Sequence, residues 1–181
     1  GYSDEALFQK VLSTLPTLKE PFFAFALTIT NHHPFEVPTE YELGLGNQDL
    51  HSYYNSVHYM DSKLGEFLSL AEKEPWFENT LIIITADTSS FQPPQSKPKD
   101  FGEFVSLRSR IPLLILGGPI EQNTEINEFA SQIDLAPTIM DLLGLTWTSP
   151  WVGKSLIAKQ DLLIAYTNRP GSYWAVMSKE G

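Results

Sequence analysis

The sequence contains no cysteine among its 181 residues. Disulfide bonds, zinc–thiolate sites, iron–sulfur clusters and cysteine nucleophiles are therefore excluded, although this absence does not fix the compartment in which the chain works. Basic residues are also few, since 12 Lys and Arg stand against 22 Asp and Glu and the formal net charge is −10. Because clustered Lys and Arg bind a phosphate backbone, this balance argues against a nucleic-acid partner.

Long hydrophobic runs are missing too. The two longest apolar stretches, residues 22–30 and 81–86, are far shorter than the roughly 20 residues that a membrane-spanning helix needs, so we expect no membrane span in this segment. With 42% hydrophobic residues, the chain has the composition of a folded globular protein. Its length suffices for one ordinary domain or for part of a larger one.

Three segments carry apolar residues at helical spacing. They predict helices at residues 7–18, 51–73 and 135–143. Ser3 or Asp4 is a candidate cap for the first helix, and Asp134 for the last, which Gly144 is suited to end because glycine readily adopts the left-handed conformation.

Short apolar runs without polar alternation lie between these helices. They predict buried strands at residues 22–29, 80–86 and 111–116, of the kind found inside a parallel sheet. Two later runs, 162–166 and 174–177, predict a C-terminal β-hairpin. The alternation of strands and helices predicts an α/β fold.

Polar side chains follow two of the predicted strands. Asn31, His32 and His33 come after the first strand, and Asp87 comes after the second. Ligands of α/β sheets bind at the carboxyl ends of strands, and His with Asp can bind a divalent metal or an anionic group. A plain turn and a plain cap explain the same residues, and one Asp with one or two His falls short of the three protein ligands that a metal site normally needs.

A series of short motifs extends over nearly the whole chain: Gly1–Glu5, Pro21–Phe23, Thr30–Phe35, Tyr53–Asp61, Asn79–Asp87, Ile111–Ile115, Ser131–Thr138 and Gly153–Leu156. In this order they resemble the sulfatase and alkaline-phosphatase superfamily, and within it the branch of lipoteichoic acid synthases and phosphoglycerol transferases. The resemblance implies a three-layer α/β/α sandwich with a mostly parallel central sheet.

The resemblance also implies that residues 1–181 form the C-terminal part of one sulfatase-like domain. The Thr, Ser or modified Cys that serves as nucleophile in the family would lie upstream, so we expect the chain alone to be inactive. The parent is expected to be a metal-dependent hydrolase or transferase, associated with the bacterial membrane on its extracytoplasmic side. Its substrate would be an anionic phosphate or sulfate ester, carried by a lipid headgroup or a glycan.

Carried over residue by residue, the resemblance assigns His32, with His33 beside it, to the substrate's anionic group. It assigns Asp87 to a pair of Asp and His that holds a divalent metal, either Mn, Mg or Ca. Thr88 stands where the family has that His, and a hydroxyl is a weaker ligand. The protein therefore binds metal poorly, or uses another ligand such as His33, or is a catalytically degenerate module that binds a headgroup or glycan.

Four basic residues gather in the sequence after Asp87, namely Lys97, Lys99, Arg108 and Arg110. An acidic chain that meets an anionic substrate needs a local positive focus. We therefore expect this loop to help attract the substrate.

Overall fold

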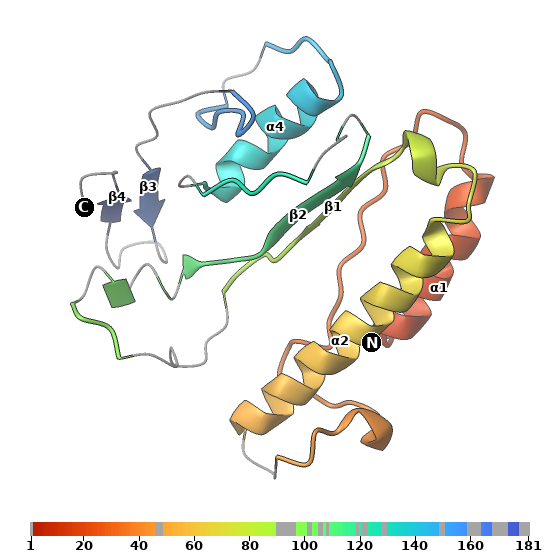
Figure 1. Cartoon of the computed structure of the whole chain (residues 1–181), viewed down its shortest axis with the longest axis vertical. Helices are drawn as coiled ribbons and strands as arrows, with labels where there is room; N and C mark the ends of the chain where they lie inside the picture. The colour runs from red at the N-terminus through yellow and green to blue at the C-terminus, as the bar shows by residue number, and fades with distance from the viewer. Residues whose placement is uncertain are drawn as a thin grey trace. The chain divides into compact units, whose positions relative to one another are not determined.

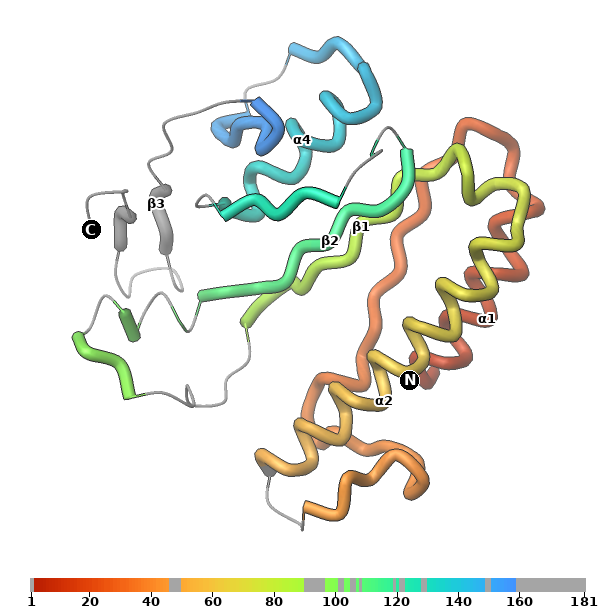
Figure 2. Tube along the Cα trace, in the orientation of Figure 1, coloured from red at the N-terminus to blue at the C-terminus, as the bar shows by residue number. Residues whose placement is uncertain are grey.

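The computed structural model describes residues 2–45, 50–89, 97–100, 103–104, 107, 109–118, 120, 123–127, 130–148 and 151–158, with the backbone alone of residues 49, 164–167 and 174–177. Backbone contacts divide the chain into two units, residues 1–117 and 118–181. Figure 1 shows the elements of each unit, and Figure 2 traces the same path as a tube.

Two helices form the larger part of the first unit. Helix α1 spans Asp4–Thr14 and helix α2 spans Asp49–Ala71, and the two pack against each other (Figure 1). The predicted helices are confirmed, and Ser3 is the cap of α1, since its hydroxyl accepts a hydrogen bond from the backbone of Ala6 at 3.3 Å. No helix in the described parts of the chain is long and apolar enough to span a bilayer.

The core of this unit lies between the two helices. Its buried apolar side chains are Leu15, Phe67, Ala71 and Trp76. Phe8 of α1 stacks on Phe67 of α2 with 5.1 Å between ring centroids. Burying such side chains stabilises the fold by about 1.5–3 kcal/mol each, so this cluster is what holds the helix pair together.

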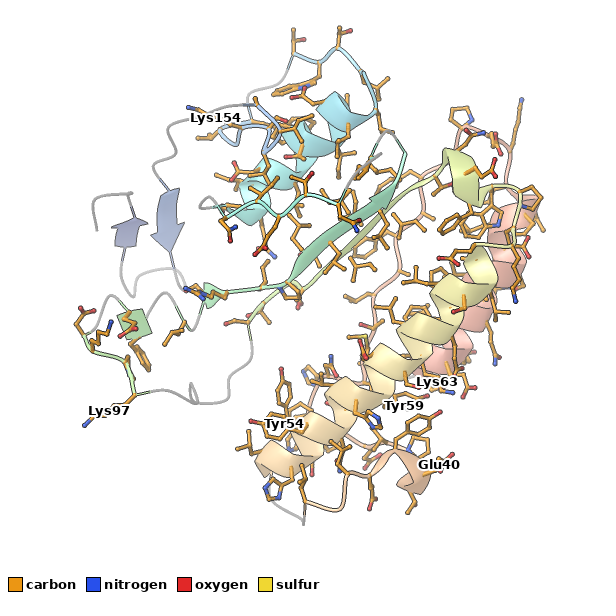
Figure 3. The ribbon with its side chains drawn as sticks, viewed as in Figure 1. Glu40, Tyr54, Tyr59, Lys63, Lys97 and Lys154 are labelled. Atoms are coloured by element: carbon orange, nitrogen blue, oxygen red, sulfur yellow. The ribbon has the colours of Figure 1, made fainter. Side chains whose placement is uncertain are left out.

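Lys63 of α2 is a buried cation at the edge of the same helix pair (Figure 3). Its Nζ lies 3.0 Å from Glu66 Oε1 and 3.6 Å from Glu5 Oε1, and 5.1 Å from the centroid of the Tyr41 ring. A hydrogen bond with Tyr41 and another with Glu66 raise the pKa of Lys63 well above its usual value, despite the opposing effect of burial. The ammonium group therefore stays charged and links α1, α2 and the turn at Tyr41.

Strands β1 (Leu81–Thr85) and β2 (Leu113–Gly117) confirm two of the predicted strands but not the parallel arrangement that we expected for them. They pair with each other in antiparallel register, with Leu81 opposite Gly117 and Thr85 opposite Leu113. The two strands are half-buried rather than buried, with Thr85 and Leu114 exposed. An all-apolar run predicts a strand but carries no information about the direction of its neighbour. The parallel sheet and the three-layer sandwich remain predictions.

Residues 22–29 are not a strand in this structure, and the prediction of a buried strand there is wrong. The stretch is extended, lies outside both described sheets and is drawn as an orange coil in Figure 1. Four of its apolar side chains are 54–86% exposed: Phe23, Phe25, Leu27 and Ile29. A strand needs a neighbour for its N–H and C=O groups, and none of the described strands pairs with this stretch.

The second unit contains helix α4, which spans Leu135–Leu142. Gly144 follows its C-cap with φ +64°, the left-handed conformation that was predicted for the end of this helix. Asp134 precedes α4, but its carboxylate does not cap that helix. One oxygen accepts from the backbone N–H of Ser131 at 2.8 Å and the other from that of Lys154 at 2.9 Å. The prediction that this side chain caps α4 is therefore wrong, because one oxygen forms a capping box with Ser131 at the preceding turn and the other is bonded to Lys154.

Thr138 of α4 strengthens the same attachment. Its hydroxyl donates to the Asp134 carbonyl at 2.6 Å and accepts from the backbone N–H of Leu156 at 3.0 Å. Strands β3 (Ile164–Thr167) and β4 (Trp174–Met177) then pair in antiparallel fashion, which confirms the predicted C-terminal pair. Asp134 and Thr138 are thus structural residues that fasten residues 154–156 to α4.

Gly153 tests how closely these segments pack. A Cβ at Gly153 would overlap the carbonyl group of Ile133 and come within 3.0 Å of the Asp134 nitrogen, so we expect Gly153→Ala to cost about 2 kcal/mol of unfolding free energy. Gly65 in α2 is the matched control, since nothing lies within 4 Å of a Cβ there. Gly65→Ala should stabilise by up to about 1 kcal/mol, because alanine favours helix. Equal effects of the two variants in urea denaturation would contradict this packing.

Candidate functional site

His32 and His33 lie in a tight turn that follows the extended stretch 22–29. The carbonyl of Ile29 accepts a hydrogen bond from the His32 N–H at 2.9 Å, and the carbonyl of His32 accepts one from the Phe35 N–H at 3.0 Å. The His33–Pro34 peptide is cis and Phe35 has φ +63°, a conformation that is uncommon for residues other than glycine. The turn exposes both histidines at the position that the sequence predicts.

The His32 ring is oriented by its own turn. Its Nδ1 lies 2.8 Å from the His33 carbonyl oxygen. A carbonyl only accepts hydrogen bonds, so Nδ1 must carry the proton of this bond. The second ring nitrogen, Nε2, is therefore the atom with which this exposed side chain would meet a substrate.

His33 is held by aromatic packing. Its ring meets the Phe35 ring edge-on, with 5.7 Å between centroids, and Phe35 meets Tyr53 of α2 in the same way at 5.6 Å. Edge-to-face pairs of this kind stabilise by about 0.5–1.5 kcal/mol beyond the area they bury. The ring of His33 thus packs on Phe35, which in turn contacts α2, while the part of His33 in binding a substrate stays a prediction.

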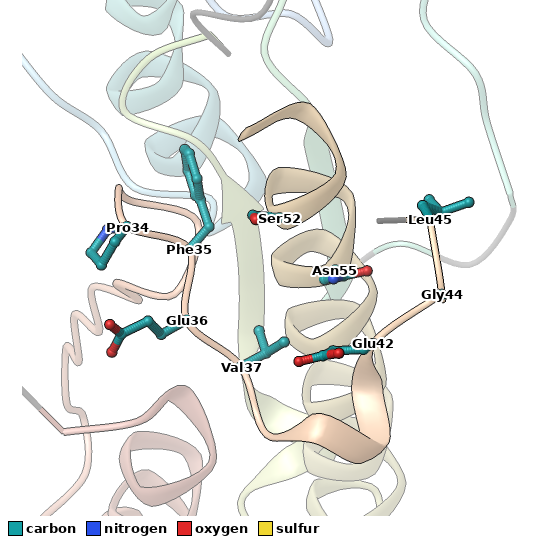
Figure 4. Close-up of a pocket in the computed structure, with 9 residues that line it drawn as sticks. All are labelled: Pro34, Phe35, Glu36, Val37, Glu42, Gly44, Leu45, Ser52 and Asn55. Atoms are coloured by element: carbon teal, nitrogen blue, oxygen red, sulfur yellow. The ribbon is translucent and has the colours of Figure 1, made fainter. Parts of the chain in front are cut away.

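A cavity of about 460 Å³ lies beside this turn (Figure 4). It is lined by Pro34, Phe35, Glu36, Val37, Glu42, Gly44, Leu45, Ser52 and Asn55. Asn55 is buried and its Oδ1 accepts from the backbone N–H of Leu43 at 2.9 Å, which holds the rim of the cavity on α2. Because its charged lining residues, Glu36 and Glu42, are both acidic, the cavity does not suit an anionic ester.

Asp87 and Thr88 follow β1 directly, as predicted, and both are exposed. The Thr88 hydroxyl donates to the Ser89 carbonyl at 3.4 Å. Within the described ranges, no three His, Cys, Asp or Glu side chains gather closely enough to hold a metal ion. One carboxylate and one hydroxyl do not fit a metal centre by themselves, and we derive no catalytic step through a metal here.

The predicted basic loop is only partly within the described residues. Lys97, labelled in Figure 3, is exposed, as are Lys99 and Arg110, whereas Arg108 lies outside the described residues. The role of this basic loop in attracting a substrate remains a prediction.

Asp4 contacts the backbone just before the histidine turn, whereas the sequence indicated only a helix cap for this residue. Its side chain is fully buried, and Oδ1 accepts hydrogen bonds from the backbone N–H groups of Ile29 at 2.9 Å and Thr30 at 3.3 Å. These partners lie 25 and 26 residues away along the chain. No local pattern could reveal the contact, since the sequence indicates only that a negative side chain is favourable at a helix N-terminus.

Comparison with known proteins places the chain in a family. The Sulfatase family model matches residues 1–145. Lipoteichoic acid synthase 2 of Bacillus subtilis is 25% identical over 157 residues, which cover 80% of this chain and 24% of that protein. Lipoteichoic acid synthase of Staphylococcus saprophyticus is 26% identical over 170 residues, which cover 88% of this chain and 26% of that protein. The chain thus spans about a quarter of the length of these relatives.

Two solved structures share the fold. A protein in the alkaline phosphatase superfamily from Vibrio parahaemolyticus has a TM-score of 0.75 at 26% identity, covering 98% of this chain and 45% of that one. The lipoteichoic acid synthase LtaP from Listeria monocytogenes has a TM-score of 0.72 at 23% identity, covering 85% of this chain and 42% of that one. With the family model matched over residues 1–145 and an alkaline-phosphatase-like fold, the chain belongs to the sulfatase family.

Proposed function

We propose that the protein containing this chain transfers or hydrolyses phosphate esters of the phosphoglycerol type. The observation that carries the proposal is the turn at His32, in which one ring nitrogen is bonded to a carbonyl and the other is left for a partner outside the turn. The likeness to lipoteichoic acid synthases supports the substrate class and an extracytoplasmic location.

His32 would act by binding the anionic group of the ester. With Nδ1–H bonded to the His33 carbonyl, Nε2 is the ring nitrogen that would face the ester, and hydrogen bonds with an ionised group are stronger than those between neutral groups. The formal net charge of −10 would otherwise repel such a substrate, so a local positive group is needed where the ester binds.

A divalent metal is a further part of the proposal. Such an ion would neutralise charge on the transferring phosphoryl group. Asp87 offers one carboxylate for it, and the other ligands would come from residues beyond those described. Thr88 adds a hydroxyl in place of a stronger imidazole ligand.

A second candidate function rests on the same position. If no metal binds, the protein is a catalytically degenerate module that holds an anionic headgroup or glycan through His32. The lack of a three-ligand cluster in the described part of the chain favours this alternative over a metal site built from these residues alone.

The substrate role of His32 can be tested in the full-length protein with vesicles of phosphatidylglycerol. His32→Ala should raise KM about tenfold to a hundredfold, because a hydrogen bond between charged groups is lost, while kcat changes less. His58→Ala is the control, since His58 lies on α2 and its Nδ1 bonds to the Tyr41 carbonyl at 3.3 Å. An unchanged KM in His32→Ala would contradict this role, and binding without turnover by the parent would favour the degenerate module.

The metal site can be tested by calorimetric titration of the full-length protein with Mn²⁺. Thr88→His should raise the affinity about tenfold, because imidazole is a better ligand than a hydroxyl for this ion, and Asp87→Asn should lower it. Glu78→Gln, which changes a carboxylate before β1 rather than after it, is the control. If Thr88→His and Asp87→Asn bind Mn²⁺ with the same affinity as the unsubstituted protein, no metal binds at this position.

A further inference from the structure

Asp4 lies at a helix terminus, and its side chain also bonds to a segment far away in the sequence. Its carboxylate is completely buried in the first turn of α1, where the positive end of the helix favours a negative charge. Burying a charge is costly unless hydrogen bonds compensate it. Here the N–H groups of Ile29 and Thr30 both donate to Oδ1, whereas Oδ2 is buried with no hydrogen-bond partner in the described part of the chain. The side chain thus joins α1 to the end of the extended stretch 22–29.

The peptide chain continues this connection to His32. Ile29 donates its N–H to Asp4, and the carbonyl of the same residue accepts from the His32 N–H at 2.9 Å. Two hydrogen bonds through one residue therefore link the buried carboxylate to the backbone of His32. Displacing Ile29 would displace the start of the turn and, with it, the imidazole.

Contacts on both sides of the turn fix that point of the chain. The stretch 22–29 belongs to neither described sheet, and its apolar side chains from Phe23 to Ile29 are mostly exposed, although Thr30 after it is buried. At the far end of the turn, Phe35 packs edge-on against Tyr53 of α2. At the near end, the Asp4 carboxylate is the side chain that bonds to the backbone of Ile29 and Thr30.

We propose that Asp4 is a positioning residue, whose carboxylate sets the place of the His32 imidazole through the backbone of Ile29 and Thr30. Asp4 itself is buried and would not touch the substrate. The proposal rests on the proposed function of His32, and it adds a residue whose effect on the substrate passes entirely through that histidine.

Asp134 provides a matched control. It is also a buried aspartate whose carboxylate accepts two backbone hydrogen bonds, from Ser131 and Lys154, but it belongs to the second unit. Asp134→Ala removes the same chemical groups as Asp4→Ala without altering the contact to Ile29. A purely structural role for Asp4 predicts the same kinetic result for both variants.

The kinetic test compares these variants in the full-length protein on phosphatidylglycerol vesicles. Asp4→Ala should raise KM about tenfold, since a small misplacement of a binding group costs one to two orders of magnitude. Asp4→Asn keeps an oxygen acceptor and should recover most of the loss, whereas Asp134→Ala should leave KM unchanged. The double variant Asp4→Ala with His32→Ala should be no worse than His32→Ala alone, because both changes act through one group.

Three kinetic results would overturn the proposal: an unchanged KM in Asp4→Ala while His32→Ala raises it, an equal rise in Asp134→Ala, or additive effects in the double variant. If Asp4→Ala fails to fold by circular dichroism, Asp4→Glu replaces it. That variant keeps the charge but moves the oxygens by one methylene, so it should raise KM in the same way.

A spectroscopic readout separates this proposal from the proposed function. In protein labelled with ¹⁵N-histidine, His32 is assigned by comparison with His32→Gln, and its shifts report whether Nδ1 carries the proton. Asp4→Ala should shift this signal and Asp134→Ala should not. A shift together with a KM that is insensitive to His32→Ala would keep the positioning role and reject the substrate role. An unshifted signal in Asp4→Ala would reject the positioning role.

Discussion

The Asp4 carboxylate accepts two hydrogen bonds, from the backbone N–H groups of Ile29 and Thr30. These bonds attach the start of the polar turn to helix α1 of the first unit. Helix α1 is held to α2 by the apolar cluster around Phe67 and by the charged contacts of Lys63. The extended stretch lies outside the described sheets, so its end is held to this helix pair by the Asp4 carboxylate of α1 and, beyond the turn, by Phe35 packed on Tyr53 of α2. The turn that carries His32 is therefore attached to both helices.

Several residues of the family-like motifs have structural roles in the fold. Asp134 and Thr138 use their side chains to hold residues 154–156, and Gly153 is needed because the carbonyl of Ile133 lies where a side chain would be. His33 packs against Phe35, and its part in binding a substrate stays a prediction. His32 differs from these residues in that its ring is oriented by the turn while its side chain is exposed.

The helices, their ends, the C-terminal strand pair and the family could be predicted from the sequence, because periodicity, Ser3, Gly144 and motif order are local properties. The antiparallel pairing of β1 with β2 could not, since an apolar run is the same for either direction. The bonds that Asp4 accepts from Ile29 and Thr30, and the one that Asp134 accepts from Lys154, escaped prediction because these partners lie 20 to 26 residues away. The histidine turn was predicted in place, but not the ring orientation that makes Nε2 the outward atom.

The extended stretch 22–29 also has a consequence for the chain in solution. It combines backbone groups outside the described sheets with exposed apolar side chains on alternating positions, from Phe23 to Ile29. Folded proteins usually cover or charge such an edge, because it is a template onto which another extended chain can add. A preparation of these 181 residues alone would therefore contain a segment that can nucleate aggregation. Replacing Phe25 with a charged residue would improve its solubility.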